Sequence, residues 1–313
     1  MPRTSRAPLA VLLLLCLLGS LGPLRNEFGP AVVHPAVLPW LLPAWPFLLA
    51  AILAAAFTVL RRIPWPSARY FRSTILIGIG LFVLPSLTLL CVKTWIDPFT
   101  QVTLLALTPV FTVVFQPYLA PSSLAPRHAL AAAIAAAAGL QLVFPFQLPG
   151  TIAAFTAWLV LVLAIVAIAA AYCSATHLAS QLPLSSAAPL AAIACAACTV
   201  ALLLAGVVEH AFGVTLAAPP IGVLWLVLVD TPSILLLFWL LPRISASRIT
   251  ARFILSPLFS TLASIALMRP SLTLRDGLGL TLAGAGSVWL LLAPVSGPEA
   301  TTSSLLLSDD LRL

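Results

Sequence analysis

Ten long apolar runs follow one another along the 313-residue chain and leave little of it for other structure. A helix that crosses a bilayer needs about 20 mostly apolar residues, and such a run satisfies its backbone hydrogen bonds in lipid by forming a helix. The runs lie at residues 8–23, 36–60, 73–93, 100–119, 127–145, 152–173, 184–208, 221–241, 248–268 and 275–294. The sequence therefore predicts an all-α membrane protein with ten transmembrane helices.

The composition excludes an ordinary soluble domain. Hydrophobic residues make up 62% of the chain and charged residues only 7%, whereas about 25% of a soluble domain is charged. The net charge of +7 would also suit a nucleic-acid partner, but the basic residues sit in short segments between the apolar runs. We therefore expect the lipid bilayer as the partner of this surface, and no nucleic acid.

The first run has a second interpretation. Arg3 and Arg6 precede a Leu-rich core that ends at Pro23, which is also the pattern of a secretory signal peptide. Nine further runs follow, and the internal repeat described below requires the first run as a helix. We therefore favour a membrane-spanning first helix over a cleaved signal.

The distribution of basic residues predicts the orientation, because basic residues gather on the cytoplasmic side of membrane proteins. With the N-terminus in the cytoplasm, eleven basic residues lie inside and four outside. Those inside are Arg3, Arg6, Arg61, Arg62, Arg69, Arg72, Arg127, Arg243, Arg248, Arg252 and Arg312, and those outside are Arg25, Lys93, Arg269 and Arg275. We expect a multi-pass protein of the inner (plasma) membrane with both termini cytoplasmic, as a monomer or a homodimer.

The chain contains an internal repeat. The landmarks of the first copy are Pro85-Ser86, Thr108-Pro109, Arg127 and Pro145, and those of the second are Pro232-Ser233, Ser256-Pro257, Arg275 and Pro294. The offset of about 148 residues equals five helices, and because five is odd the second copy crosses the membrane in the opposite sense. Apolar helices also resemble one another by composition alone, but matched Pro, Arg and hydroxyl positions favour a true repeat.

The repeat divides the chain into two inverted five-helix halves, at residues 1–147 and 148–295, followed by a cytoplasmic tail at 296–313. Inverted repeats of this kind are typical of secondary transporters, in which one half rocks against the other around a central site.

The repeated motif resembles that of EamA-type permeases of the drug/metabolite transporter superfamily. The resemblance rests on Leu105–Thr112 followed by Arg127, and on Leu255–Phe259 followed by a glycine-rich helix at 277–286. It covers nearly the whole chain and implies ten spans in two halves that export amino acids, other metabolites or toxic compounds. Family members often carry a Glu at the ends of helices four and nine. Those positions fall here near Ser122 and Arg269, so no role that depends on that carboxylate is expected.

Asp230 is the carboxylate nearest the middle of any apolar run. Burial favours the neutral form of a carboxyl group, so Asp230 is a candidate for a proton or cation site, or for a counter-charge to a substrate amine. It also lies two residues before Pro232, which can break a helix, so the carboxylate is equally a candidate cap for the second half of a broken helix.

Two stripes of polar side chains complete the predicted substrate-binding residues. Residues four apart share a helix face. The first stripe is Thr108, Thr112 and Gln116 in helix four, and the second is Ser256, Ser260 and Ser264 in helix nine. In the family that the sequence resembles, these two helices border the central cavity. Hydroxyls near a proline can instead bond backbone carbonyls or join helices, which explains Gln116 less well.

The predicted function is therefore a secondary transporter that exports a small metabolite, an amino acid or an amphiphilic compound, with protons as a possible coupling ion. We assigned no Lys or Arg to mid-membrane, which favours neutral, zwitterionic or cationic solutes over phosphorylated ones. The rivals are a membrane-embedded enzyme that acts on a lipid and a non-transporting scaffold. The four His residues are scattered over different segments, so we expect no catalytic residues, no metal and no cofactor.

Overall fold

The structure is a computed structural model of the whole chain, and it describes residues 6–28, 44–119, 126–144, 146–211, 221–269 and 272–292. Helices are the only regular secondary structure within these residues, which confirms the predicted all-α class. The elements are α1 (Arg6–Phe28), α2 (Ala44–Leu60), α3 (Ala68–Gly78), η1 (Ile79–Val83), α4 (Leu84–Val92), α5 (Pro98–Leu105), α6 (Thr108–Leu119), α7 (Pro126–Val143), α8 (Ile152–Ser180), η2 (Leu184–Ser186), α9 (Ala187–Ala211), α10 (Ile221–Leu240), α11 (Ala246–Thr250), α12 (Arg252–Met268) and α13 (Leu274–Leu292).

A helix occupies the place of each predicted run, with some changes of length. α8 continues to Ser180, beyond the predicted end at residue 173, and α3 begins at Ala68 instead of residue 73. The predicted tail at 296–313, and residues 36–43 of the second run, lie outside the described part of the chain.

The two Pro-Ser pairs have different backbones around them. Before Pro85 the helix widens into a π-helical turn, η1, and the Leu84 amide donates to the Ile79 carbonyl. A proline ring clashes with the carbonyl four residues earlier, and the extra residue of a π turn relieves such crowding. α10, in contrast, runs unbroken through Pro232. In both copies the serine hydroxyl donates to a carbonyl four residues earlier, Ser86 to Phe82 and Ser233 to Val229, each at 2.8 Å.

Two of the predicted helices are interrupted. α5 begins after Asp97, whose carboxylate accepts from the Thr100 amide at 2.6 Å, and it ends at Leu105, before α6 begins at Thr108. α11 begins after Ser245, ends at Thr250 and is followed by α12 after the single residue Ala251. Asp97 and Ser245 are 148 residues apart and so occupy equivalent positions of the repeat.

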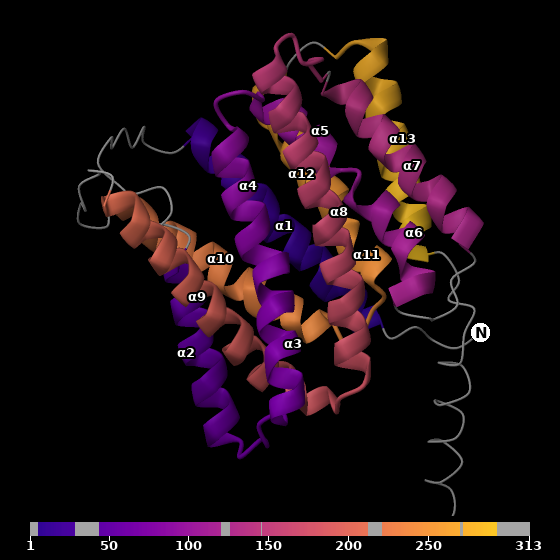
Figure 1. Cartoon of the computed structure of the whole chain (residues 1–313). Coiled ribbons are helices and arrows are strands. Elements are labelled where there is room, and N and C mark those ends of the chain that lie inside the picture. The colour runs from indigo at the N-terminus through magenta and orange to yellow at the C-terminus, as the bar shows by residue number, and fades with distance from the viewer. Residues whose placement is uncertain are drawn as a thin grey trace, which may run out of the picture.

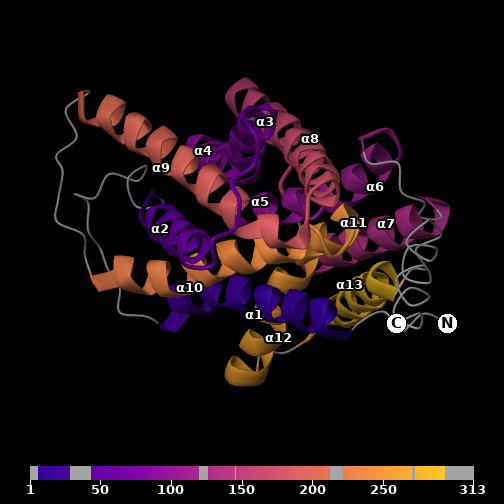
Figure 2. The ribbon, with the colours of Figure 1, turned by 90° about the horizontal axis from the view of Figure 1, so that it is seen from below.

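Helices from the first half of the chain pack on helices from the second half. The most extensive pair is α7 with α13, followed by α2 with α9, and then by α6 with α8 and α1 with α12. Figure 1 shows α7 and α13 side by side at one end of the bundle, and Figure 2 shows α11 well inside its outline. Gly139 allows the close approach of α7 and α13, because a Cβ there would lie 2.3 Å from the Ala283 amide nitrogen.

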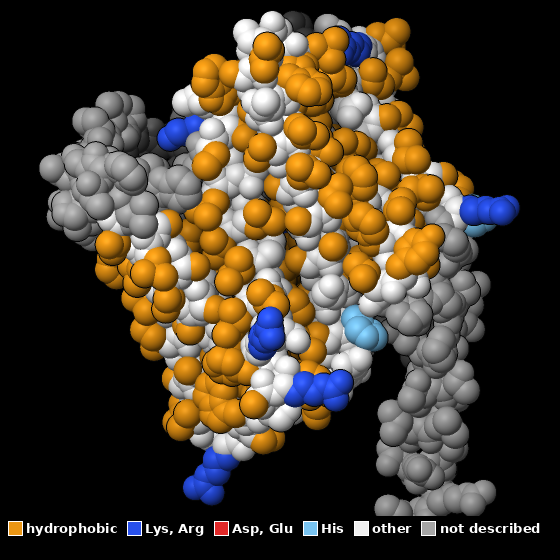
Figure 3. Space-filling model, in the orientation of Figure 1, with side chains coloured by type: hydrophobic (Ala, Val, Ile, Leu, Met, Phe, Trp, Pro, Cys, Tyr) orange, Lys and Arg blue, Asp and Glu red, His pale blue; other side chains and the backbone are white. Residues whose placement is uncertain are grey.

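The surface of the bundle is that of a membrane protein. Five helical segments are long and apolar enough to cross a bilayer, namely Ala68–Leu89, Pro98–Leu119, Ile152–Ser180, Leu184–Val207 and Ala246–Met268, and four shorter ones are also apolar. Large apolar side chains stand exposed, as at Leu60 and Ile152. Hydrophobic side chains cover most of the face in Figure 3, and few Lys or Arg side chains interrupt them. Such a continuous apolar surface suits contact with lipid.

Candidate functional site

The first predicted stripe lies in the interior of the bundle. Thr108 and Thr112 are fully buried on α6, and Gln116 is 4% exposed. The Thr108 hydroxyl donates to the Leu105 carbonyl at 2.6 Å, and the Thr112 hydroxyl donates to the Thr108 carbonyl at 2.8 Å. Both hydroxyl protons are therefore used within the chain's own backbone, as the alternative interpretation held. α6 packs against α8, where the Cys173 thiol donates to the Thr112 carbonyl at 3.6 Å.

The second stripe lies on α12, which packs against α1. Ser256 is half-buried and hydrogen-bonds Cys16 of α1, and a Cβ at Gly19 would lie 2.8 Å from the Ser256 hydroxyl oxygen. Ser260 is buried and Ser264 is half-buried. The helices of the two stripes thus pack against α8 and α1, which are equivalent helices of the predicted repeat. That a solute contacts either stripe stays a prediction.

Asp230 is half-buried on α10. Its neighbour Thr231 is buried and donates to the Pro46 carbonyl at 3.3 Å, which ties this part of α10 to α2. Because α10 is continuous through Pro232, no helix begins at Asp230 for the carboxylate to cap. The capping interpretation is therefore wrong, and the coupling role of Asp230 stays a prediction.

The structure reveals a group of functional candidates that the sequence did not single out, which we call the arginine cluster: Tyr172, Arg248, Arg252 and Phe253. The Arg252 guanidinium carbon lies 5.5 Å from the centre of the Tyr172 ring and 5.1 Å from that of Phe253. The two rings meet edge to face with centres 6.0 Å apart. Aromatic faces attract a guanidinium, and the attraction grows when the pair is shielded from water.

Arg252 lies between the two halves of the chain. Tyr172 belongs to α8, and α12, the helix of Arg252, also packs against α1. α1 and α8 are the first helices of the two predicted halves. Arg248 lies one turn before Arg252, on α11, and is only 9% exposed, because α11 packs against both α6 and α8. The cluster therefore brings positive charge into the interior of the bundle.

The sequence led us to expect no cation in the interior, whereas Arg248 is buried and Arg252 is half-buried in the bundle. That these arginines face the cytoplasm stays a prediction. Hydropathy assigned Arg248 and Arg252 to the polar edge of the ninth run. Because the interior does contain these cations, the exclusion of anionic solutes loses its basis.

Two buried polar atoms in this region have no hydrogen-bond partner among the described residues. One is the Tyr172 hydroxyl, on a side chain that is fully buried, and the other is the Gln116 Oε1 atom. A buried polar group left without a partner costs about 1–3 kcal/mol. The two atoms belong to α8 and α6, which pack against each other.

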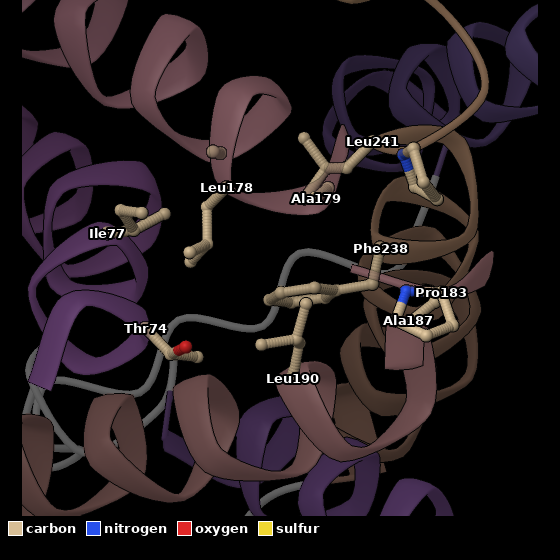
Figure 4. A pocket seen from close by; sticks show the side chains of 11 residues that line it. Thr74, Ile77, Leu178, Ala179, Pro183, Ala187, Leu190, Phe238 and Leu241 are labelled. Carbon is tan, nitrogen blue, oxygen red and sulfur yellow. The ribbon is translucent and has the colours of Figure 1, made fainter. Parts of the chain in front are cut away.

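A small apolar pocket opens between α3, α8, α9 and α10 (Figure 4). Ala175 and Ala179 line it from α8, one and two turns after Tyr172, and Phe238 projects into it from α10. Thr74 contributes the only hydroxyl of the lining, and that hydroxyl donates to the Tyr70 carbonyl. At its edge, Arg243 lies over the Trp239 ring, 4.0 Å from the centre, and partial burial lowers the pKa of its guanidinium.

Among the residues whose placement the structure describes, no three His, Cys, Asp or Glu side chains are grouped so as to hold a metal ion. The four buried cysteines and the exposed Cys91 are all free thiols.

Comparison with known proteins supports the fold alone. No protein-family model and no curated protein matches the chain. A solved structure described only as "Crystal structure of protein" is similar, with a TM-score of 0.69 and 17% sequence identity over 92% of this chain and 99% of that chain. The arrangement of helices therefore exists, almost from end to end, in an experimentally determined protein.

Proposed function

We propose that the chain is a secondary transporter that moves a small organic solute across the inner membrane, and that it resembles EamA-type permeases of the drug/metabolite transporter superfamily. In this proposal ten helices cross the membrane as two inverted halves, at residues 1–147 and 148–295, with both termini in the cytoplasm. The halves rock against each other and expose the interior between them first to one side and then to the other.

The pattern of helix packing supports the inverted repeat. A shift of about 148 residues turns α1 into α8, α2 into α9, α5–α6 into α11–α12 and α7 into α13. Under this shift the contact of α1 with α12 becomes the contact of α8 with α6, and both rank among the most extensive. The pairs α2–α9 and α7–α13 map onto themselves, as expected for helices beside a twofold axis. Similar composition alone does not produce contacts that map onto one another.

The position of the arginine cluster carries the functional proposal. Ionisable side chains inside a membrane protein are costly, and they mark solute or ion pathways. Arg252 contacts Tyr172 of α8, and its own helix α12 packs against α1 of the first half, so it lies near the boundary of the two proposed halves. A site at that boundary becomes accessible from each side in turn when the halves rock. We further propose Asp230 as the proton-coupling group and the two polar stripes as walls of the path.

Solute exchange in proteoliposomes tests the function. Vesicles loaded with an unlabelled amino acid, nucleoside, organic cation or organic acid receive a trace of the same compound in labelled form. A transporter accumulates the label transiently by counterflow, and the uptake saturates. Empty vesicles and vesicles that contain heat-denatured protein set the background. An absence of counterflow for every compound class, from protein that remains folded in the same vesicles, would contradict the proposal.

A further inference from the structure

The Arg252 guanidinium has an aromatic environment but no described counter-charge of its own. It is half-buried between the rings of Tyr172 and Phe253. The described carboxylates have other positions: Asp97 caps α5, Asp276 accepts from Thr273, and Asp230 lies on α10. A guanidinium in such a place gains much from an anion that arrives from outside.

The Tyr172 hydroxyl is the second half of the site. Its side chain is fully buried, and its hydroxyl has no hydrogen-bond partner among the described residues. A phenol is a good donor, and its ring already lies against Arg252. The ring centre lies 5.5 Å from the guanidinium carbon, so an anion held by the guanidinium is within reach of a hydroxyl proton that no described residue accepts.

We propose that Arg252 and Tyr172 form a subsite for the carboxylate of a small amphiphilic solute, an assignment of substrate class that rests on the proposed transport function. A planar guanidinium presents two parallel N–H groups that match the two oxygens of a carboxylate. The surroundings are apolar, because the rings of Phe253 and Tyr172 both lie against the guanidinium. An organic acid with an apolar body suits such surroundings, whereas a phosphate dianion normally takes more polar donors.

Binding of three matched probes to the full-length protein in lipid nanodiscs tests the subsite. Benzoate carries the carboxylate, benzamide has the same shape without charge, and phenylphosphonate carries a larger anion with more charge. We expect benzoate to bind with millimolar or better affinity, and benzamide and phenylphosphonate to bind at least about tenfold more weakly, because a charge-assisted pair is lost or poorly matched. Equal binding of benzamide, or tighter binding of phenylphosphonate, overturns the carboxylate assignment.

Variants locate the subsite. Arg252→Gln should weaken benzoate binding by about tenfold to a hundredfold, and Tyr172→Phe, which removes only the hydroxyl, by about three- to tenfold. Arg252→Lys keeps the charge but lacks the planar guanidinium, so its loss of benzoate affinity should be intermediate. This variant serves as the test if Arg252→Gln does not fold. Arg275→Gln is the control, because Arg275 is exposed in the first turn of α13. Benzoate affinity unchanged in both folded Arg252→Lys and Tyr172→Phe protein would overturn the proposal.

The same variants separate this inference from the proposed function. If benzoate binds through Arg252 and no compound shows counterflow, the carboxylate subsite stands and transport fails. If a solute shows counterflow that Arg252→Lys and Tyr172→Phe leave unchanged, transport stands and the subsite fails.

Discussion

Adding a single methyl group at Gly139 should separate the two most closely packed helices of the molecule. A Cβ at this position would lie 2.3 Å from the Ala283 nitrogen, 2.7 Å from the Gly279 carbonyl oxygen and 2.9 Å from the Ala283 Cα. All three atoms belong to the backbone of α13, so no side-chain rotation can relieve the clash. Ordinary contact begins at 3.4 Å, and α7 and α13 must therefore move apart locally by about 1 Å.

The cost follows from this displacement. Inserting a methyl group into a well-packed interface costs about 1–3 kcal/mol, and the upper part of that range applies where only backbone can yield. Gly284→Ala is the matched control on α13, because a Cβ there has nothing within 4 Å. Replacing this helical glycine with alanine should leave the stability unchanged or raise it by up to about 1 kcal/mol.

Thermal unfolding of detergent-solubilised protein, followed by the loss of the monodisperse peak in size-exclusion chromatography, measures both variants. We expect Gly139→Ala to lower the midpoint by several degrees and Gly284→Ala to leave it unchanged or raised. A midpoint for Gly139→Ala equal to that of the wild type would refute the close packing of α7 on α13.

Three further predictions concern other parts of the chain. Asp97→Ala removes two hydrogen bonds with Thr100, at 2.6 and 2.8 Å, and should lower the free energy of unfolding by about 1–2 kcal/mol in a denaturation experiment. Ser245→Ala should cost less, because Ser245 stands at the equivalent position without a side-chain capping bond. Equal costs for the two variants would refute the cap at Asp97. Thr231→Val keeps the shape of a buried side chain and loses its 3.3 Å hydrogen bond to the Pro46 carbonyl. The same measurement should show a free energy of unfolding lower by about 1 kcal/mol, and an unchanged value would contradict a role for that bond in stability. Asp230→Asn should abolish solute-coupled proton flux into proteoliposomes while counterflow without a pH gradient persists, and unchanged proton flux would remove Asp230 from the coupling step.

The positions of the helices could be predicted because each needs about 20 apolar residues and the chain supplies such runs in series. The interruptions inside the helices could not be predicted from the sequence. Pro232 was the expected break, yet α10 is continuous there, and the breaks occur at Ala106-Leu107 and at Ala251. A proline removes one backbone donor, which a helix packed on its neighbours tolerates, whereas the sequence around Ala251 carries no strong breaking signal.

The sequence identified polar residues that share helix faces, but their chemistry depends on contacts that periodicity does not show. Thr112 lies on the predicted face of its helix, while its hydroxyl bonds its own backbone. The burial of Arg248 arises because α11, a helix of five residues, packs against α6 and α8, which are distant in the sequence. A hydropathy window averages over more residues than α11 contains, so it treats the two arginines as the edge of a run.

The central claim is that the interior between the two halves opens to both sides of the membrane, and thiol accessibility tests it most directly. In a protein whose five native cysteines are replaced by alanine, Ser256→Cys places one thiol beside Gly19 of α1, next to the arginine cluster. Ser185→Cys, exposed between α8 and α9, is the control. With a membrane-impermeant thiol reagent added to one side of oriented proteoliposomes at a time, we predict that Ser256→Cys is labelled from either side and Ser185→Cys from one side only. Labelling of Ser256→Cys from a single side, or from neither, would contradict alternating access.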